Sequence, residues 1–164
     1  NVSGIWAIGD VTGKLLLAHV ASSMGIHCAE NITGKETSPL DYLMIPSATY
    51  CHPQVASFGM TEAQATEAGH EIKVGRFPFL ANGKALGLGE SAGFTKIITD
   101  AKINYSYPAN MIGPEATELL PVQTICENLE LTSEDIARNI HAHPTLSETV
   151  MEAAEAVEGN AIHM

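Results

Sequence analysis

Hydrophobic and polar positions follow one another along this chain in patterns that predict both helices and strands. From Leu15 to Ile32 apolar residues recur at helical spacing with polar residues between them, and Gly34 supplies a stop. Shorter strand-like stretches follow at residues 47–50, 55–58, 71–79, 93–100 and 103–112. A helix, then strands, then further helices is typical of an α+β fold, an antiparallel sheet with helices packed on one face.

Helix starts in the later part of the chain are predicted from capping signals. A Ser or Thr followed three residues later by Glu or Gln is the pattern of a capping box. It occurs at Thr61 with Gln64 and again at Thr145 with Glu148, which predicts a last helix capped by Thr145. Proline is favoured at the first helical position, so another helix is predicted to start at Pro114.

Three stretches are harder to assign. The apolar run Ile5–Ile8 has the composition of a buried strand. Residues 81–89 contain three glycines and are interpreted as a hairpin-like or irregular connection. Pro108 falls within a strand pattern, which indicates an edge strand or a bulge because proline cannot donate a ladder hydrogen bond.

Composition narrows the functional classes. The 164 residues include 8 Lys and Arg against 19 Asp and Glu, a net charge of −11, which argues against nucleic acid and anionic membranes as partners. No apolar run approaches the roughly 20 residues of a membrane-spanning helix, and no signal peptide is recognisable. Three scattered cysteines favour a reducing compartment, the cytoplasm or else the mitochondrial matrix or a plastid, and no metal site is expected.

The stretch His141-Ala142-His143-Pro144-Thr145-Leu146-Ser147-Glu148 is the strongest candidate for chemistry. A histidine before a helix can meet a glutamate in the first turn, and the carboxylate then fixes the imidazole tautomer and raises the basicity of the other ring nitrogen. This predicts an acid–base dyad, with a cis bond before Pro144. Alternatively, Glu148 only completes a capping box and the histidines are polar surface residues; both interpretations can hold together.

A second candidate lies near the start of the chain. Asp10 follows an apolar run and precedes a helix, where a carboxylate can accept hydrogen bonds from ligand hydroxyls and the helix N-terminus favours negative charge. The alternative is that Asp10 only caps the turn. No Gly-x-Gly-x-x-Gly sequence occurs, so a whole Rossmann nucleotide site is not expected within these residues.

These motifs together resemble the pyridine nucleotide–disulfide oxidoreductases. The resemblance extends through nearly the whole chain in order and spacing, and the stretch at 141–148 is its most specific part. Its other matching segments are Gly4-Ile5-Trp6-Ala7-Ile8-Gly9-Asp10-Val11, Leu17-Ala18-His19, and residues 46–57, 77–82 and 112–116. The chain departs from the family pattern at 104–111 and at Pro121, where the interface sheet and a packing helix are expected.

The resemblance implies an organisation and cofactors. Residues 1–34 would be the end of an FAD-binding domain, and residues 35–164 a C-terminal interface domain. Asp10 would accept hydrogen bonds from the ribityl chain of FAD, and Leu17, Ala18 and His19 would face the pyrimidine end of the flavin. FAD and NAD are implied for the parent protein, whereas this fragment alone is expected to be inactive and without tightly bound FAD.

The resemblance also implies an activity and partners. The parent would oxidise dihydrolipoyl groups with NAD, with His143 as the general base and Glu148 as its orienting partner. The dyad would serve the active site of the other subunit of a homodimer, and a dihydrolipoyl domain of a 2-oxo acid dehydrogenase or related complex would be the partner. The alternatives are another disulfide reductase or a transhydrogenase of the same family, or, in isolation, a non-catalytic dimerisation module.

Overall fold

The computed structural model describes residues 2–103 and 105–164, so that Asn1 and Asn104 lie outside the described residues. The chain divides into two compact units, Asn1–Ile45 and Pro46–Met164. The division falls after Ile45, later than the boundary that the sequence suggests after Gly34. Assignment of the first unit to an FAD-binding domain stays a prediction.

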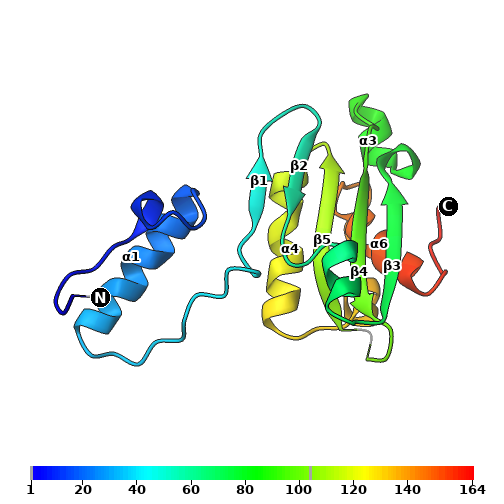
Figure 1. Cartoon of the computed structure of the whole chain (residues 1–164). Coiled ribbons are helices and arrows are strands. Elements are labelled where there is room, and N and C mark those ends of the chain that lie inside the picture. Colours follow the sequence, from blue (N-terminus) through cyan, green and yellow to red (C-terminus); the bar gives the residue numbers. More distant parts are fainter. Residues whose placement is uncertain (1, 104) are drawn as a thin grey trace. The chain divides into compact units, whose positions relative to one another are not determined.

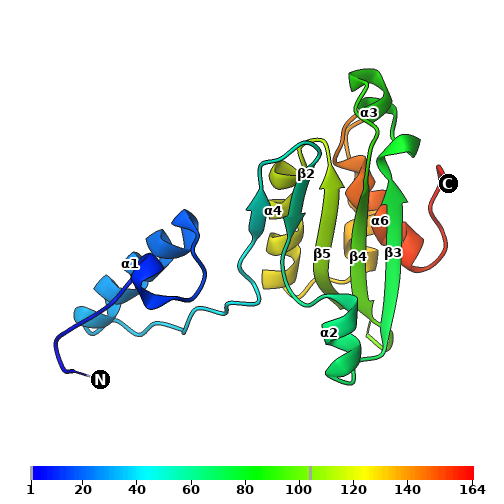
Figure 2. The ribbon, with the colours of Figure 1, turned by 45° about the horizontal axis from the view of Figure 1, so that its top comes forward.

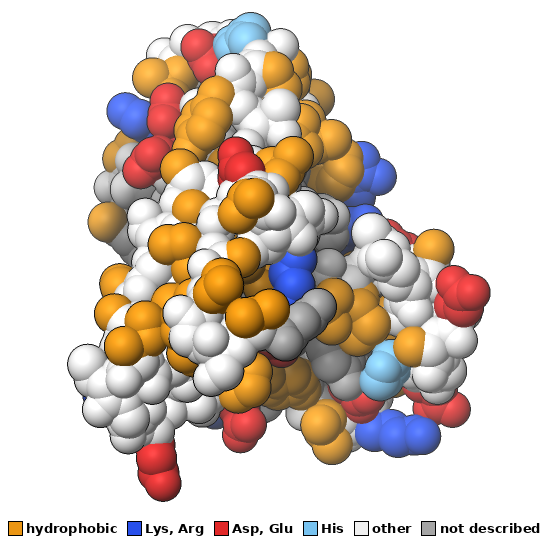
Figure 3. Space-filling model, turned by 60° about the vertical axis from the view of Figure 1, so that its left-hand side comes forward, with side chains coloured by type: hydrophobic (Ala, Val, Ile, Leu, Met, Phe, Trp, Pro, Cys, Tyr) orange, Lys and Arg blue, Asp and Glu red, His pale blue; other side chains and the backbone are white. Residues whose placement is uncertain are grey.

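The first unit is built around one helix. A short 3₁₀ turn, η1 (Gly9–Thr12), precedes α1 (Ala18–Ile32), which ends close to the predicted stop at Gly34. Only Gly9, Val20 and Met24 are buried among the described residues of this unit. Among the described residues, no strand pairs with residues 5–8, so the strand expected there does not form. The side chains of Ile5, Trp6 and Ile8 are exposed. Figure 3 shows many apolar side chains, in orange, exposed on one face of the molecule.

The second unit is an antiparallel sheet of five strands (Figure 1). The strands are β1 (Ser47–Thr49), β2 (Gln54–Ser57), β3 (Ile72–Pro78), β4 (Phe94–Asp100) and β5 (Ser106–Gly113). Their order across the sheet is β1-β2-β5-β4-β3, with every neighbouring pair antiparallel. The last strand in sequence therefore lies in the middle of the sheet.

Helices cover the sheet as the α+β pattern predicts (Figure 2). The helical segments are α2 (Glu62–Glu67), η2 (Phe79–Ala81), α3 (Gly83–Leu88), α4 (Ala116–Asn128), α5 (Ser133–Arg138) and α6 (Glu148–Val157). Helix α6 packs on β3 and β4, and α4 packs on β2 and β5. Helix α2 is joined to the sheet by an ion pair of 2.6 Å between Glu62 and Lys96.

The contact between α6 and the sheet is close and specific. A Cβ atom on Gly75 of β3 would lie 2.0 Å from the Ala153 carbonyl oxygen of α6, so only glycine fits there. On β4, the buried hydroxyl of Thr95 hydrogen-bonds to the hydroxyl of Thr149 on α6 at 2.9 Å. These contacts fix α6 against the sheet, and with it the loop that precedes the helix.

Two sequence expectations for the connections are wrong. Residues 81–89 form α3 because the Asn82 side chain accepts a hydrogen bond from the Ala85 N–H and Gly89 ends the helix in the left-handed region. Helix α4 begins at Ala116 and not at Pro114, and it continues through Pro121. The capping box of Thr61 with Gln64 is confirmed.

Pro108 lies in the central strand and not at an edge. Pairing of β4 with β5 shifts register between Ile97 and Thr99, whose partners are Ala109 and Ser106. Two residues of β5 thus oppose Ile98, which is a bulge, as one of the two sequence interpretations predicts. A bulge leaves a position outside the regular ladder, so a residue without an N–H is accommodated there.

Candidate active site

The predicted histidine–glutamate pair is formed at the start of α6. The Nδ1 atom of His143 lies 2.9 Å from Oε1 of Glu148, and the bond between His143 and Pro144 is cis. The carboxylate accepts, so Nδ1–H donates and Nε2 keeps its lone pair. The side chain of His143 is 74% exposed, whereas that of Glu148 is 14% exposed. A half-buried carboxylate therefore orients an imidazole that is largely exposed.

Glu148 is held in its ionised form by the groups around it. Its second oxygen accepts a hydrogen bond of 2.7 Å from the backbone N–H of Thr145. Burial acts to raise the pKa of Glu148, but hydrogen bonds from Thr145 and His143, and the charges of His143 and His163, outweigh burial and lower that pKa. The position in the first turn of α6 adds the favourable end of the helix dipole.

Thr145 does not cap α6 as the sequence predicts. The helix begins at Glu148 with Ser147 before it, and the hydroxyl of Thr145 donates instead to the Ala142 carbonyl oxygen at 2.7 Å. Only the half of the capping box in which Glu148 accepts from the Thr145 N–H is present. The threonine hydroxyl thus closes the loop that carries His143.

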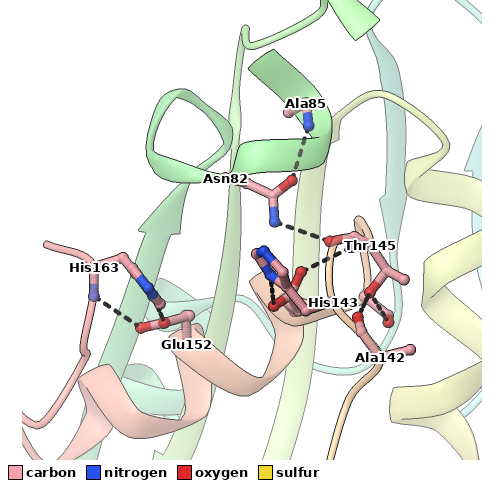
Figure 4. Close-up of polar contacts among 9 residues, drawn as sticks. Asn82, Ala85, Ala142, His143, Thr145, Glu152 and His163 are labelled. Atoms are coloured by element: carbon pink, nitrogen blue, oxygen red, sulfur yellow. Dashed lines mark hydrogen bonds and ion pairs between the residues drawn. The ribbon is translucent and has the colours of Figure 1, made fainter. Parts of the chain in front are cut away.

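Asn82 ties this loop to the other side of the site. Its side-chain nitrogen donates to the Thr145 carbonyl oxygen at 3.0 Å, while its oxygen accepts from the Ala85 N–H at 2.9 Å (Figure 4). Asn82 is only 4% exposed, so neither bond is readily replaced by water. One buried amide therefore links the start of α3 to the loop of His143.

A cavity of about 220 Å³ lies beside the pair. It is lined by Phe77, Ala81, Asn82, Gly83, Leu86, His143, Glu148, Glu152 and His163. The lining combines apolar side chains from β3, η2 and α3 with two imidazoles and two carboxylates. The arrangement can hold a small ligand against an imidazole that is ready to accept a proton.

Sequence reasoning missed three residues of this cavity. Asn82 appears in the sequence only within a matching segment, without a role. Glu152 and His163 carry no motif, although Glu152 follows Glu148 by four residues and so lies on the same helix face. That spacing is the one signal in the sequence that points to Glu152.

The other candidates of the sequence lie apart from the pair. Nδ1 of His141 donates to the Asn139 carbonyl oxygen at 2.8 Å, so the ring is bound to its own loop and not to Glu148. The three cysteines are free thiols, and burial raises the pKa of Cys126. Across residues 2–103 and 105–164, no group of His, Cys, Asp and Glu is arranged to hold a metal ion.

The predicted flavin residues lie in the first unit. Asp10 is exposed in η1, and Leu17 stands in extended conformation before α1, where Ala18 and His19 are the first exposed residues of the helix. Leu17, the residue before the helix, makes no side-chain cap hydrogen bond. The N-terminus of a helix favours groups with negative or partial negative charge, which is the kind of ligand that the sequence predicts there.

Residues 45–154 match the dimerisation domain of the pyridine nucleotide-disulphide oxidoreductases. The chain therefore belongs to this family of oxidoreductases. It is 54% identical to a dihydrolipoyl dehydrogenase of Corynebacterium glutamicum and 50% identical to one of Mycobacterium leprae, each alignment covering 99% of this chain and 35% of the relative. The chain thus spans about a third of the length of these relatives.

Solved structures show the same fold. LpdA from Mycobacterium tuberculosis superposes with a TM-score of 0.87 at 25% identity, over 93% of this chain and 33% of that one. The Cu(II) complex of RclA from Escherichia coli, an HOCl-induced flavoprotein disulfide reductase, superposes with a TM-score of 0.85 at 27% identity, over 93% and 35%. The open antiparallel sheet with its helices is thus the fold of these proteins.

Proposed function

We propose that this chain is the C-terminal part of a dihydrolipoyl dehydrogenase, a flavoprotein that oxidises dihydrolipoyl groups with NAD. The observation that carries the proposal is the hydrogen bond from Nδ1 of His143 to Glu148, which leaves Nε2 free beside an open cavity. The identity of 54% to a dihydrolipoyl dehydrogenase supports this reaction over that of the more distant disulfide reductase.

In the proposed reaction, Nε2 of His143 takes the proton of a dihydrolipoyl thiol. An ordinary thiol has a pKa of about 8.5, and only the thiolate is an effective nucleophile in disulfide exchange. The Glu148 carboxylate stabilises the imidazolium that results and keeps the ring in the reactive tautomer. His143 thus generates at neutral pH the thiolate that would attack a disulfide of the parent protein, forming a mixed disulfide and releasing one thiolate of that disulfide. Glu148 orients the ring of His143.

The proposed cofactors are FAD and NAD, which serve as the electron acceptors of the reaction when bound to the parent protein. In this chain, Asp10 would bind hydroxyl groups of the ribityl chain. Leu17, Ala18 and His19, at the start of α1, would face the pyrimidine end of the flavin. The first unit would therefore be the end of the FAD-binding domain.

The proposed assembly is a homodimer in which the dyad of one subunit serves the flavin of the other. Most of the His143 ring is exposed, as a group that completes a site on another subunit needs to be. Exposed apolar residues on α4 and directly after it offer a surface for the second copy; they are Val122, Ile125 and Leu129. The dihydrolipoyl domain of a 2-oxo acid dehydrogenase or related complex is the proposed substrate carrier.

The proposed location is the cytoplasm. The dihydrolipoyl dehydrogenases of Corynebacterium glutamicum and Mycobacterium leprae, to which the chain is similar, are bacterial proteins. Among the described residues, no helix is both long and apolar enough to cross a membrane.

The test is a substitution in the full-length, FAD-loaded enzyme. His143→Gln should lower the turnover of dihydrolipoamide by about 10²- to 10⁴-fold, the usual range for a positioned acid–base group. Glu148→Gln should cost less, because it orients the base without moving the proton itself. His141→Gln is the matched control and should change turnover little. Equal losses in the His143 and His141 variants, or no loss in the His143 variant, would contradict the proposed role.

A further inference from the structure

The cavity of the dyad contains a second imidazole–carboxylate pair. Nδ1 of His163, near the C-terminus, is hydrogen-bonded and ion-paired to Oε1 of Glu152. Oε2 of Glu152 also accepts from the backbone N–H of Ile162 at 2.8 Å. The C-terminal segment is thereby fastened to α6 by one carboxylate.

Both pairs lie on one side of α6. Glu148 and Glu152 are four residues apart, so their side chains share a helix face one turn from each other. Glu148, Glu152 and both imidazoles line the same cavity, and Figure 4 shows the rings of His143 and His163 on the same side of the helix. Two carboxylates at this spacing on a helix repel each other when both are ionised, and a positive charge close to them offsets that repulsion.

In the second pair, the carboxylate of Glu152 is buried, so its hydrogen-bond partners matter for stability. The side chain of Glu152 is 2% exposed, whereas that of His163 is 60% exposed. An ionised carboxylate so deeply buried is costly unless hydrogen bonds and an opposite charge compensate it. The Ile162 N–H and Nδ1 of His163 both hydrogen-bond to this carboxylate, so the tail and its histidine are held in a defined position at the cavity wall.

We propose that His163, fixed by Glu152, is a positioning residue of the catalytic dyad, acting through its positive charge on the ionisation of Glu148 and His143. This inference rests on the acid–base function proposed above. The charge of His163 is one of the causes that lower the pKa of Glu148, which places the two groups within electrostatic reach. The C-terminal tail is thereby part of the active site, although it makes no bond to the dyad.

Few titratable side chains other than His163 line the cavity beside Glu148. The lining side chains from β3, η2 and α3 carry no titratable group, and the titratable residues that line the cavity are His143, Glu148, Glu152 and His163. On β3, Lys73 pairs instead with Glu158, at the opposite end of α6 from Glu148. On the neighbouring α5, Arg138 pairs with Glu134.

The test is the pH dependence of turnover in the full-length enzyme carrying His163→Gln. Without the positive charge, protonation of both Glu148 and His143 becomes easier, so the acid limb of kcat/KM should move to higher pH by about 0.3 to 1 unit. His163→Lys keeps a positive charge that can pair with Glu152 and should return the limb toward the wild-type position. The control is His70→Gln, at a histidine that lies just before β3 begins, and this variant should leave the acid limb of kcat/KM where it is in the wild type.

The outcomes separate this inference from the function on which it rests. An unchanged profile in the His163→Gln enzyme, or an equal loss at every pH, would overturn the electrostatic role while the large loss in the His143→Gln enzyme persists. An enzyme that tolerates His143→Gln would overturn the acid–base function itself, and the present inference with it.

Discussion

The two units of this chain bury their apolar residues to very different extents. In the second unit, Ile97 on β4 is 1% exposed and lies in a core between the sheet and its helices. In the first unit, Ile26 on α1 is 65% exposed, and Trp6 and Leu16 are also largely open. Both units have sequences rich in apolar residues, so the difference arises from what each unit can pack against.

The second unit encloses its own core, whereas the first leaves large apolar side chains exposed. Contiguous exposed apolar side chains on a folded protein mark interaction surfaces. The chain belongs to a family whose matching model is a dimerisation domain, and the relatives that it matches are about three times its length. The comparison can be tested by placing matched substitutions in the two units.

The largest contrast is expected for truncated isoleucines. Ile97→Ala should destabilise the chain by about 2–5 kcal/mol, because it leaves a cavity in a packed core. Ile26→Ala should change the free energy of unfolding by less than about 0.5 kcal/mol, because its side chain is already largely in water. Urea unfolding of both variants measures the difference, and similar losses would show that the comparison is wrong.

Two glycines provide the next contrast. Gly75→Ala should cost about 1–3 kcal/mol, because the new Cβ would overlap the Ala153 carbonyl of α6. Gly25→Ala lies within α1, where the nearest atom would be Cδ1 of Ile8 at 3.7 Å, and should stabilise by about 0.5–1 kcal/mol through helix propensity. Thermal unfolding followed by circular dichroism would reveal opposite shifts; shifts of the same sign would contradict the close packing of α6 on β3.

A smaller effect is expected at Asn82, which links two segments of the second unit. Asn82→Ala should destabilise by about 1–2 kcal/mol, because it removes the cap of α3 and the bond to the Thr145 carbonyl. Asn82→Asp keeps the acceptor for the Ala85 N–H but loses the donor, so it separates the two contributions. If Asp restores full stability and full turnover, the bond to the loop of His143 has no role.

The smallest effect concerns acid. The pKa of Glu148 is lower in the folded chain than its ordinary value of 4.5, so its ionised form stabilises the fold above that value. The stability that this ionised carboxylate contributes should be lost as the pH falls below 4.5 and through the folded pKa. Urea unfolding at pH 7 and in acid measures how much the free energy of unfolding changes between the two conditions. Glu148→Gln should show a smaller change than the wild-type protein, and equal changes in both proteins would contradict this prediction.

The sequence was informative where a signal is local. Helix α1, the five strands and the capping box at Thr61 follow from spacing and caps, and the contact of His143 with Glu148 follows from their positions around a helix start. It failed at residues 81–89, where three glycines concealed a helix that Asn82 caps. It also missed the central position of β5, since strand order depends on pairings between distant segments.

By itself, the sequence determined the fold class, the family resemblance and the two residues of the candidate dyad, because each depends on residues that are neighbours or share a helix turn. Only the tertiary structure brought Asn82 to the loop of His143 and the tail residue His163 to Glu152. It alone also left Ile5–Ile8 unpaired while closing a core around Ile97. The physical reason is that burial and long-range hydrogen bonds depend on which surfaces meet, and a strand or apolar face is stable only where another segment covers it.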